Sequence, residues 1–348
     1  MKAETMLMWK SRKGLRVSLG IGAATIMAAL LLYGSFKRSG TAHASPAPEF
    51  LSELPPGAPT LAYLDFAAVR ASSFYQHRPD KSSITVPNAD YAEFMRSTGF
   101  DFEKDLDRVA IASWPAQAGG EPKKNIAIAE GRFDRAKIAD YAKQQGRVDH
   151  RKGSDVYVFN GGDRSNSGSV SLTFLDDHRI VMVDGPSIEP FFMVRSVQGR
   201  DSAREHADRV DGAAMFVVSS VPPIPDNAGS EAQAAQLAAL ARSVQWITLA
   251  ARPEGDNVRV SLEGECDNDT DARQLQSALE LLRMFGRAGL DSPKTRQSMD
   301  SDGLAELKTL LNSAEITQSA QRVRILLEVT PDVFKLSQPG KAQSFRQQ

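Results

Sequence analysis

The sequence contains few of the residues that form disulfide bonds or catalytic sites. Cys266 is the one cysteine in 348 residues, so no disulfide can form within the chain. It ends a stretch with strand character, where a lone cysteine is typical of a small buried apolar side chain. A lipoprotein anchor would need its cysteine close to the N-terminal apolar segment, and Cys266 lies far from it. The sequence therefore indicates neither a disulfide scaffold nor a lipid-modified N-terminus.

Histidine is scarce as well, and the common catalytic and ligand-binding motifs are missing. The five histidines, none of which pairs with another at metal-ligand spacing, are His43, His77, His150, His178 and His206. No glycine precedes a Lys-Ser or Lys-Thr pair as in a phosphate-binding loop. The polar segment 161–169 lacks the Gly-x-Ser-x-Gly pattern of a nucleophile elbow and predicts a hairpin loop. We therefore predict no catalytic residue, no metal site, no cofactor and no enzymatic activity.

Charge is nearly balanced overall but is divided unevenly along the chain. Hydrophobic residues make up 41% and charged residues 24% of the sequence, as in a folded globular protein. The net charge is −1, but residues 1–44 hold seven basic residues and one acid, which leaves 35 basic and 42 acidic residues, about −7, for the rest. A net-acidic domain without a basic, aromatic-rich patch repels a phosphate backbone. We therefore expect no nucleic-acid partner.

One long apolar run, close to the N-terminus, predicts a membrane helix. The 20 residues from Val17 to Phe36 carry no charge, and a helix of that length rises about 30 Å, the thickness of the hydrocarbon core. Five basic residues precede the run and two follow it, which favours a cytoplasmic N-terminus and a periplasmic domain. We predict a cytoplasmic basic tail at 1–16 and a single-pass signal anchor at 17–36. The alternative is secretion to the periplasm after cleavage at Ala44, because Ala42-His43-Ala44 fits the small-x-small rule.

The remaining chain has the pattern of a linker followed by an α+β domain. Prolines near 46–48 and 55–59 predict a stiff linker over 37–58, with one helical turn at 49–54. Apolar alternation predicts strands at 61–66, 109–113, 126–130, 156–159, 170–175, 180–183, 215–218, 246–250, 258–262 and 323–329. Helical periodicity predicts helices at 89–97, from Asp134, at 188–194, at 231–242, from Asp269 and around Leu304–Leu311. The tail 336–348 is expected to be disordered.

The two halves of this domain repeat one order of elements. Residues 128–134 align with 261–267 around a shared Glu-Gly pair, and each segment follows a strand–turn–strand and opens a helix. The shared order of strand, helix, strand, strand, helix, strand is that of a ferredoxin-like unit, with its helices on one face of an antiparallel sheet. We predict two tandem βαββαβ-type repeats, at 59–198 and 210–335, joined by the charged segment 199–209. Whether the two repeats share one sheet stays open at this point.

Glu130 and Glu263 are the candidate site residues that the repeat places alike. Paired carboxylates could act as general acid and base, and Asp65 is a further polar group that a pocket between the repeats could hold. The alternative is structural: both glutamates cap a helix or face solvent where a strand meets a helix, with Gly131 and Gly264 supplying the turn.

Acidic clusters and large aromatic residues also have structural explanations. Asp267, Asp269 and Asp271 alternate as in a calcium loop, but alanines stand at the loop's sixth and twelfth positions, so helix capping is the better interpretation. The acids of 101–107 have the same explanation. Four aromatic residues are expected in the core or on a sheet face: Trp114, Phe191, Phe192 and Trp246. The helix from Asp269 is expected to bury Leu275, Leu279 and Leu282.

Three segments carry a family resemblance. Residues 97–109, with the sequence STGFDFEKDLDRV, resemble a signature of uncharacterised exported proteins of soil bacteria, notably acidobacterial ones. Residues 129–134 and 250–255 are similar to the same family. The resemblance covers roughly residues 55–335 and implies a membrane-anchored protein without an assigned activity, so no functional residues carry over.

These observations lead to one functional expectation and two alternatives. We expect a single-pass, membrane-anchored envelope protein whose domain is a non-catalytic binding or scaffold module. Its expected partners are the membrane, through the N-terminal helix, and an envelope protein. One alternative is a small-molecule or lipid carrier with an apolar cavity. The other is a hydrolase whose site residues converge only in three dimensions.

Overall fold

The computed structural model describes residues 47–77, 89–116, 123–151, 153–160, 169–193, 202–210, 212–221, 242–293, 295 and 301–332. They all belong to one unit, Ser35–Gln348, whereas a second unit, Met1–Gly34, lies wholly outside them. The predicted anchor at 17–36, the Ala42-His43-Ala44 motif, the loop at 161–168, nearly all of the helix at 231–242 and the tail at 336–348 also fall outside the described residues. Within the described part, no helix combines the length and apolarity needed to cross a bilayer.

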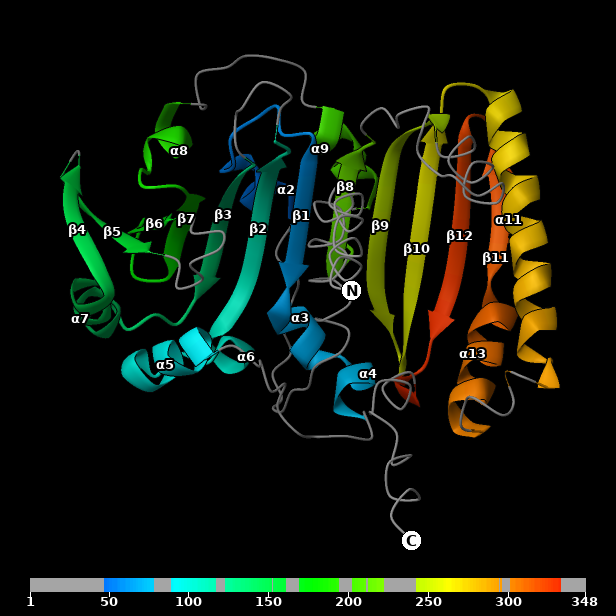
Figure 1. Ribbon diagram of the computed structural model, residues 1–348, viewed down its shortest axis with the longest axis horizontal. Coiled ribbons are helices and arrows are strands. Elements are labelled where there is room, and N and C mark those ends of the chain that lie inside the picture. The colour runs from blue at the N-terminus through cyan, green and yellow to red at the C-terminus, as the bar shows by residue number, and fades with distance from the viewer. Residues whose placement is uncertain are drawn as a thin grey trace, which may run out of the picture. The chain divides into compact units, whose positions relative to one another are not determined.

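Twelve strands form one continuous sheet in which neighbouring strands run antiparallel (Figure 1). From edge to edge the order is β11-β12-β10-β9-β8-β1-β2-β3-β7-β6-β5-β4. Their bounds are β1 Thr60–Asp65, β2 Leu106–Trp114, β3 Lys124–Gly131, β4 Gly146–Arg151, β5 Ser154–Asn160, β6 Ser169–Phe174, β7 Arg179–Asp184, β8 Met215–Ser220, β9 Val244–Glu254, β10 Asn257–Cys266, β11 Glu315–Ser319 and β12 Arg322–Val329. Because β1 pairs with β8, both halves of the chain share this sheet.

Side-chain caps fix where several helices begin. The helices are α2 Ala47–Ser52, α3 Phe66–Ala71, α4 Ser73–Gln76, α5 Ala89–Thr98, α6 Phe102–Asp105, α7 Arg135–Gln145, α8 Glu189–Met193, α9 Ser202–Ala207, α11 Asp269–Leu290 and α13 Ser301–Ser313. Asp101, Asp134 and Asn268 each accept a hydrogen bond from a backbone N–H in the first turn of α6, α7 and α11, respectively. The predicted helix starts near Asp101, Asp134 and Asp269 are therefore confirmed.

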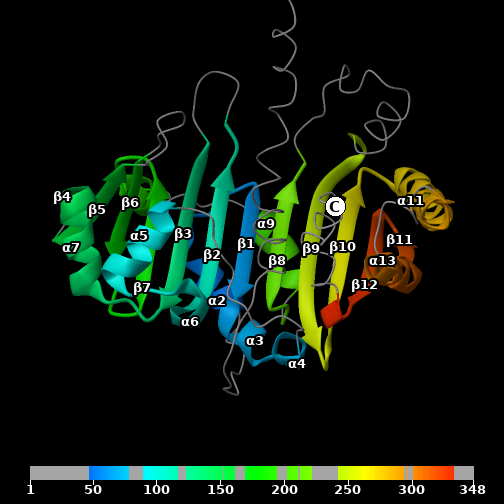
Figure 2. The same ribbon diagram turned by 60° about the horizontal axis from the view of Figure 1, so that its bottom comes forward.

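Helices cover both faces of the sheet. Successive residues of a strand point to opposite faces, so two neighbouring residues of β3 identify the helices on each face. On the first face, Ile128 of β3 belongs to a cluster with residues of α2 and α9 and with Phe191 of α8. On the second face, the neighbouring Ala129 packs with Ile138 of α7 and with Phe94 of α5. Figure 2 shows α5 and α7 at one end of the sheet and α11 and α13 at the other. The mixed α/β, antiparallel class is confirmed, but the helices are not confined to one face as expected for a ferredoxin-like unit.

The first-face core reaches into the segment that its composition assigns to the linker. Phe50, Leu51 and Leu54 are buried beside Leu61 of β1, so residues 47–58 pack as part of the domain. Of the prolines that predict a linker, Pro48 lies in the first turn of α2, whereas Pro55, Pro56 and Pro59 follow the helix. The largest fully buried side chains are Leu54, Leu61, Ile126, Ile128, Ile138, Val158, Val181, Val183, Ile188, Phe191, Phe216 and Val218. Phe216 of β8 stacks on Tyr63 of β1 with ring centroids 5.5 Å apart, which joins the two halves of the sheet.

Candidate functional site

A buried carboxyl group lies where β1 passes into α3. Asp65 is 4% exposed, and its Oδ1 accepts a 2.7 Å hydrogen bond from the backbone N–H of Ala68, which makes it the N-cap of α3. The Tyr63 hydroxyl donates to Oδ2 over 3.5 Å, the long limit of a hydrogen bond. Burial raises the pKa of Asp65, and the Ala68 N–H and the Arg108 guanidinium only partly offset that rise. Burial and the Asp65 charge likewise raise the pKa of Tyr63.

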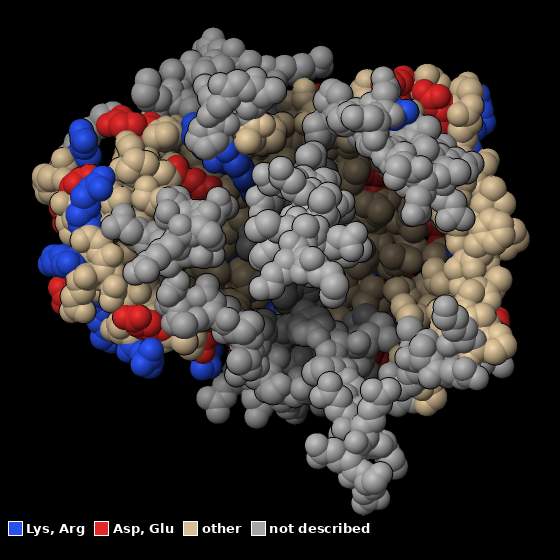
Figure 3. Space-filling view, viewed as in Figure 1, with Lys and Arg blue, Asp and Glu red and all other residues tan. Residues whose placement is uncertain are grey.

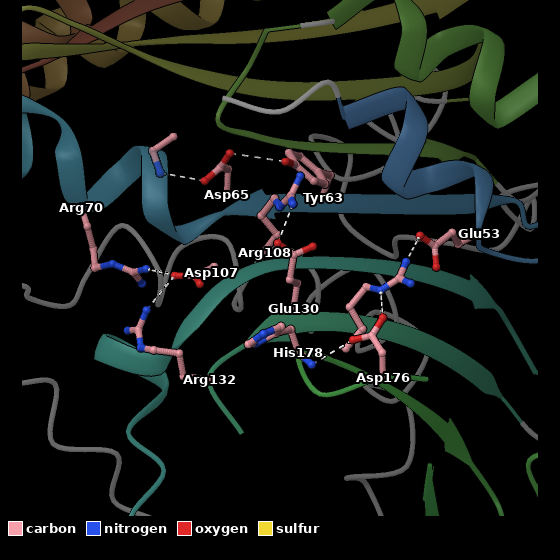
Figure 4. Close-up of polar contacts among 12 residues, drawn as sticks. Glu53, Tyr63, Asp65, Arg70, Asp107, Arg108, Glu130, Arg132, Asp176 and His178 are labelled. Atoms are coloured by element: carbon pink, nitrogen blue, oxygen red, sulfur yellow. Dashed lines mark hydrogen bonds and ion pairs between the residues drawn. The ribbon is translucent and has the colours of Figure 1, made fainter. Parts of the chain in front are cut away.

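Arg108 and Glu130 continue this polar cluster across the neighbouring strands. They are Cα partners on β2 and β3, and Arg108 Nη2 lies 2.5 Å from Glu130 Oε1 (Figure 4). The Arg108 guanidinium also stands 5.3 Å from the centre of the Phe50 ring of α2, a cation–π arrangement. The ion pair is therefore held beneath α2 and fastens that helix to the sheet.

Two further ion-pair groups hold the edges of this region (Figure 4). Arg179 of β7 bridges Glu53, just after α2, at 2.5 Å and Asp176 of the preceding turn at 2.6 Å. Asp107 contacts Arg70 of α3 and also lies 3.6 Å from Arg132, just after β3. Each group joins a helix or turn to the end of a strand and thereby stabilises the fold.

The two candidate carboxylates, Glu130 and Glu263, do not converge. Glu263 of β10 pairs with Arg324 of β12 at 2.7 Å, as Glu130 pairs with Arg108. Five strand spacings separate β3 from β10, which corresponds to roughly 24 Å. A general acid and base that act on one bond must lie far closer than this. The structure supports a structural role for both, as ion-pair partners between strands and not as helix caps.

The glycines that follow these glutamates differ in their surroundings. Gly131 and Gly264 lie within strands, so the prediction that they supply a turn is wrong. A side chain at Gly131 would meet the Asp105 carbonyl oxygen at 2.3 Å, because α6 passes directly into β2 alongside the end of β3. At Gly264 the nearest atoms belong to the side chains of Val244 and Leu275, at 3.5 Å and 3.6 Å.

His206 of α9 is the most buried histidine that the structure describes. Its Nδ1 lies 2.7 Å from the Ser202 carbonyl oxygen, and its ring stacks on Trp246 with centroids 4.4 Å apart. Its Nε2 lies 3.3 Å from Glu265 Oε2, a contact with the distance of an ion pair but without hydrogen-bond geometry. Burial works against ionisation of Glu265, but the hydrogen bond from Arg209 and the nearby His206 lower its pKa overall. This cluster fastens α9 to β9 and β10.

The remaining predicted residues have structural surroundings. Asp269 and Asp271 lie in the first turn of α11 behind the Asn268 cap, and Asp101 caps α6, as the capping interpretation predicts. Cys266 is buried, and burial raises the pKa of its thiol. Phe191 is buried, and the other three predicted core aromatics, Trp114, Phe192 and Trp246, are partly buried against the same cluster. Over the described ranges, no three His, Cys, Asp or Glu side chains are grouped closely enough to hold a metal ion.

Among the residues that the structure describes, the most exposed large apolar side chains gather on α11. Leu281, Met284 and Phe285 are 52%, 55% and 65% exposed, and Ala288 is exposed beside them. Their spacing of i, i+3, i+4 and i+7 places all four on one side of the helix. We call this set the outer stripe. Figure 3 shows the edge formed by α11 mostly uncharged, whereas the opposite edge, at β4 and α7, carries many charged side chains.

A separate inner stripe attaches α11 to the sheet. Ala272, Leu275 and Leu279 pack with Cys266, Val323 and Ile316 of the strands beneath. The prediction that Leu282 is buried is wrong, since it is 47% exposed. The reason is that this cluster ends at Leu279, and the helix then approaches α13 through Gly286, which lies beside Leu311. The spacing that begins at Leu281 is the sequence signal that could have revealed the outer stripe.

Comparisons with known proteins bear on this fold only distantly. No family model matches the chain, and no curated protein matches it. Among solved structures, crystal form III of TP0453 has a TM-score of 0.44 and 12% identity over 84% of this chain and 96% of that chain. Crystal form IV of TP0453 has a TM-score of 0.42 and 11% identity over 83% of this chain and 94% of that chain.

Proposed function

We propose that the chain is a single-pass, membrane-anchored envelope protein whose α+β domain is a non-catalytic binding or scaffold module on the periplasmic side. The uncharged run from Val17 to Phe36, with its basic flanks, supports the anchor. The outer stripe carries the binding part of the proposal, because large apolar side chains that gather on one exposed face are typical of contact surfaces. The surroundings of the candidate acids support the non-catalytic part, since Asp65 caps a helix and Glu130 and Glu263 each pair with an arginine.

We further propose that the domain is a duplicated unit. Outward from the central pair, one arm of the sheet has the order β1-β2-β3-β7-β6 and the other has β8-β9-β10-β12-β11. In both arms the third strand leads through a helix to a hairpin whose last strand pairs with that third strand. Glu130 faces Arg179 across the third and last strands, and Glu263 faces Arg324 in the same way. The strands β4 and β5 would then be an addition to the first unit.

Photo-crosslinking in whole cells tests whether the outer stripe is a contact surface. A photoreactive phenylalanine analogue replaces Phe285 in the full chain, and a matched variant carries it at Val148, which is 37% exposed on the opposite edge strand. We expect adducts to an envelope protein or to membrane lipid at residue 285 and few adducts at residue 148. Loss of all adducts at residue 285, while the chain stays in the membrane fraction, would contradict a contact surface at α11.

Two outcomes would favour the alternative functions. Lipid or another small molecule that co-purifies with the domain in fixed proportion, without adducts at residue 285, would favour a carrier. Hydrolysis of an ester, amide or glycoside substrate that disappears in Asp65→Asn while the fold is retained would favour an enzyme that uses the buried carboxyl group.

A further inference from the structure

We infer that the outer stripe of α11 docks on the surface of an anionic phospholipid bilayer, so that the domain lies on the membrane that anchors it. The inference rests on the proposed membrane anchor and names the partner of the proposed contact surface. Leu281, Met284 and Phe285 are side chains that enter the acyl boundary when an amphipathic helix lies parallel to a bilayer.

The outer stripe is preformed and held rigidly. Arg283 Nη1 donates to the Ala314 carbonyl oxygen at 2.5 Å, and Arg287 Nη2 donates to the Leu311 carbonyl oxygen at 3.0 Å. These bonds fasten the second half of α11 to α13 and to the start of the last hairpin. A helix that is already folded and fixed to a domain loses little conformational entropy when it docks, so even a small apolar area contributes to binding.

The charges in the second half of α11 match an anionic surface better than a second copy of the same helix. Over all of α11, three arginines (Arg273, Arg283 and Arg287) balance three acids (Asp269, Asp271 and Glu280), but from Glu280 onward two arginines stand against one acid. Glu280 itself lies 2.6 Å from Arg283, so the positive charge prevails over the second half of the helix. Two copies that met along α11 would bring like charges together, whereas anionic headgroups attract them. The domain from Ser45 onward is net acidic, which leaves the second half of α11, with two arginines and one acid, as a local exception.

The length of chain before the domain allows this contact. Ten residues separate Phe36, where the predicted anchor ends, from Ala47, where α2 begins, and ten residues span at most about 35 Å. α2 packs beside β1, and α11 packs on β10 and β12. Four strand spacings, about 19 Å, separate β1 from β12. An anchored domain can therefore turn α11 toward the bilayer, and the tether keeps it within reach at all times.

Quenching by lipid in vesicles tests the contact directly. The full chain, in a Cys266→Ala background, carries an environment-sensitive fluorophore at Met284→Cys or, as the control, at Val148→Cys. It is reconstituted in vesicles of phosphatidylcholine and phosphatidylglycerol, with and without bromine on the acyl chains. We expect the brominated lipid to lower the emission of the label at residue 284 about twofold and to leave residue 148 nearly unchanged. Equal, low quenching at both positions in vesicles that carry the chain would overturn the inference.

A second label separates the role of the apolar side chains from misfolding. With the fluorophore at Ala288→Cys, the double variant Leu281→Ser/Phe285→Ser should lose the quenching while its circular dichroism and urea midpoint stay close to those of the parent. Retained quenching in the folded double variant would overturn the inference. Dilution to less than one chain per vesicle decides between lipid and a second copy, because quenching by lipid persists and shielding by a partner copy disappears.

Flotation of the vesicles separates the failure of this inference from the failure of the proposed function. A chain that does not float with the vesicles contradicts the membrane anchor and thereby the proposed function. A chain that floats, but whose label at residue 284 stays in water, contradicts only the docking of α11. Adducts to a protein from residue 285 in cells, together with a label in water, would assign the outer stripe to a protein partner instead.

Discussion

At the scale of single residues, Asp65 shows how burial and hydrogen bonding oppose each other. Burial favours the protonated carboxyl group, whereas the Ala68 N–H and Arg108 favour the carboxylate. The raised pKa means that burial prevails in the folded state. A carboxyl group whose pKa rises on folding stabilises the fold at pH values below its ordinary pKa. That contribution is lost as the pH rises through the folded-state pKa.

Asp65→Asn should therefore change how stability depends on pH. Asparagine keeps the cap on α3 but cannot ionise, so the free energy of unfolding of the variant relative to the parent should increase as the pH rises from about 3.8, the ordinary value. Urea unfolding at a series of pH values measures this difference. Asp65→Ala, which loses the cap, should cost about 1 kcal/mol more than Asp65→Asn. A difference that does not vary with pH would contradict the burial of the charge.

The ion pair between Arg108 and Glu130 is expected to contribute more than an exposed pair. Its side chains are only 19% and 26% exposed, whereas those of Lys143 and Asp140 are 62% and 70% exposed. A double-mutant cycle with Arg108→Met and Glu130→Gln should give a coupling of about 1–2 kcal/mol. The matched cycle at Lys143 and Asp140 should give about 0.5 kcal/mol or less. Equal couplings would mean that water reaches the half-buried pair as readily as the exposed one.

At the scale of elements, Gly131 and Gly264, which align in the sequence, differ in the side chains that they can accommodate. Gly131→Ala would place a methyl group against the Asp105 carbonyl oxygen, where the backbone of α6 and β2 cannot move without unpairing β2 from β3. We expect a loss of about 3 kcal/mol or more. Gly264→Ala meets only side chains at ordinary contact distances, so its effect should stay within about 1 kcal/mol. Thermal unfolding of both variants provides the comparison, and a larger loss at Gly264 would contradict the placement of α6.

The sequence predicts elements best where pattern and caps agree. Asp134 before a periodic segment predicts α7, and the apolar runs at 246–250 and 258–262 predict β9 and β10. The strand β4 was not predicted, because its residues Gly146–Arg151 are mostly polar and lie on an edge with little burial to impose an alternation. The strand β11 is short and polar for the same reason. Propensity alone cannot identify such strands, since pairing to a neighbour creates them.

The candidate site could be predicted only in part. The alignment of Glu130 with Glu263 is visible in the sequence, but their arginine partners depend on strand order and register. The burial of Asp65 and of α2 depends on long-range packing. For α2, the prolines around it also favour the interpretation as a linker. The outer stripe of α11 has a visible period, yet an apolar period normally predicts a buried face. Here the helix has two such faces, and only the fold shows which one the sheet covers.

At the scale of the whole molecule, the central strand pair decides how the domain unfolds. β1 and β8 pair along Thr60–Leu64 and Met215–Ser219, with the Tyr63 and Phe216 rings stacked across the junction. A single core cluster extends across this junction, from Val158 of β5 to Ala250 of β9. The two halves of the chain share this sheet and this core and cannot separate without exposing both, so we expect them to unfold together.

Tryptophan reporters in the two halves test this cooperativity. Trp114 lies at the end of β2 and Trp246 lies in β9, and a Trp9→Phe background leaves these two as the remaining indoles. Replacing either one by phenylalanine gives two single-tryptophan variants. After the stability change of each substitution is subtracted, the urea midpoints from the fluorescence of the two variants should agree with each other and with circular dichroism. Phe216→Ala, at the junction, should then lower both midpoints together and cost about 4 kcal/mol. Midpoints that separate in this variant would mean that each repeat is stable alone. The continuous sheet would in that case be a contact between two domains, and the duplicated unit would itself be the folding unit.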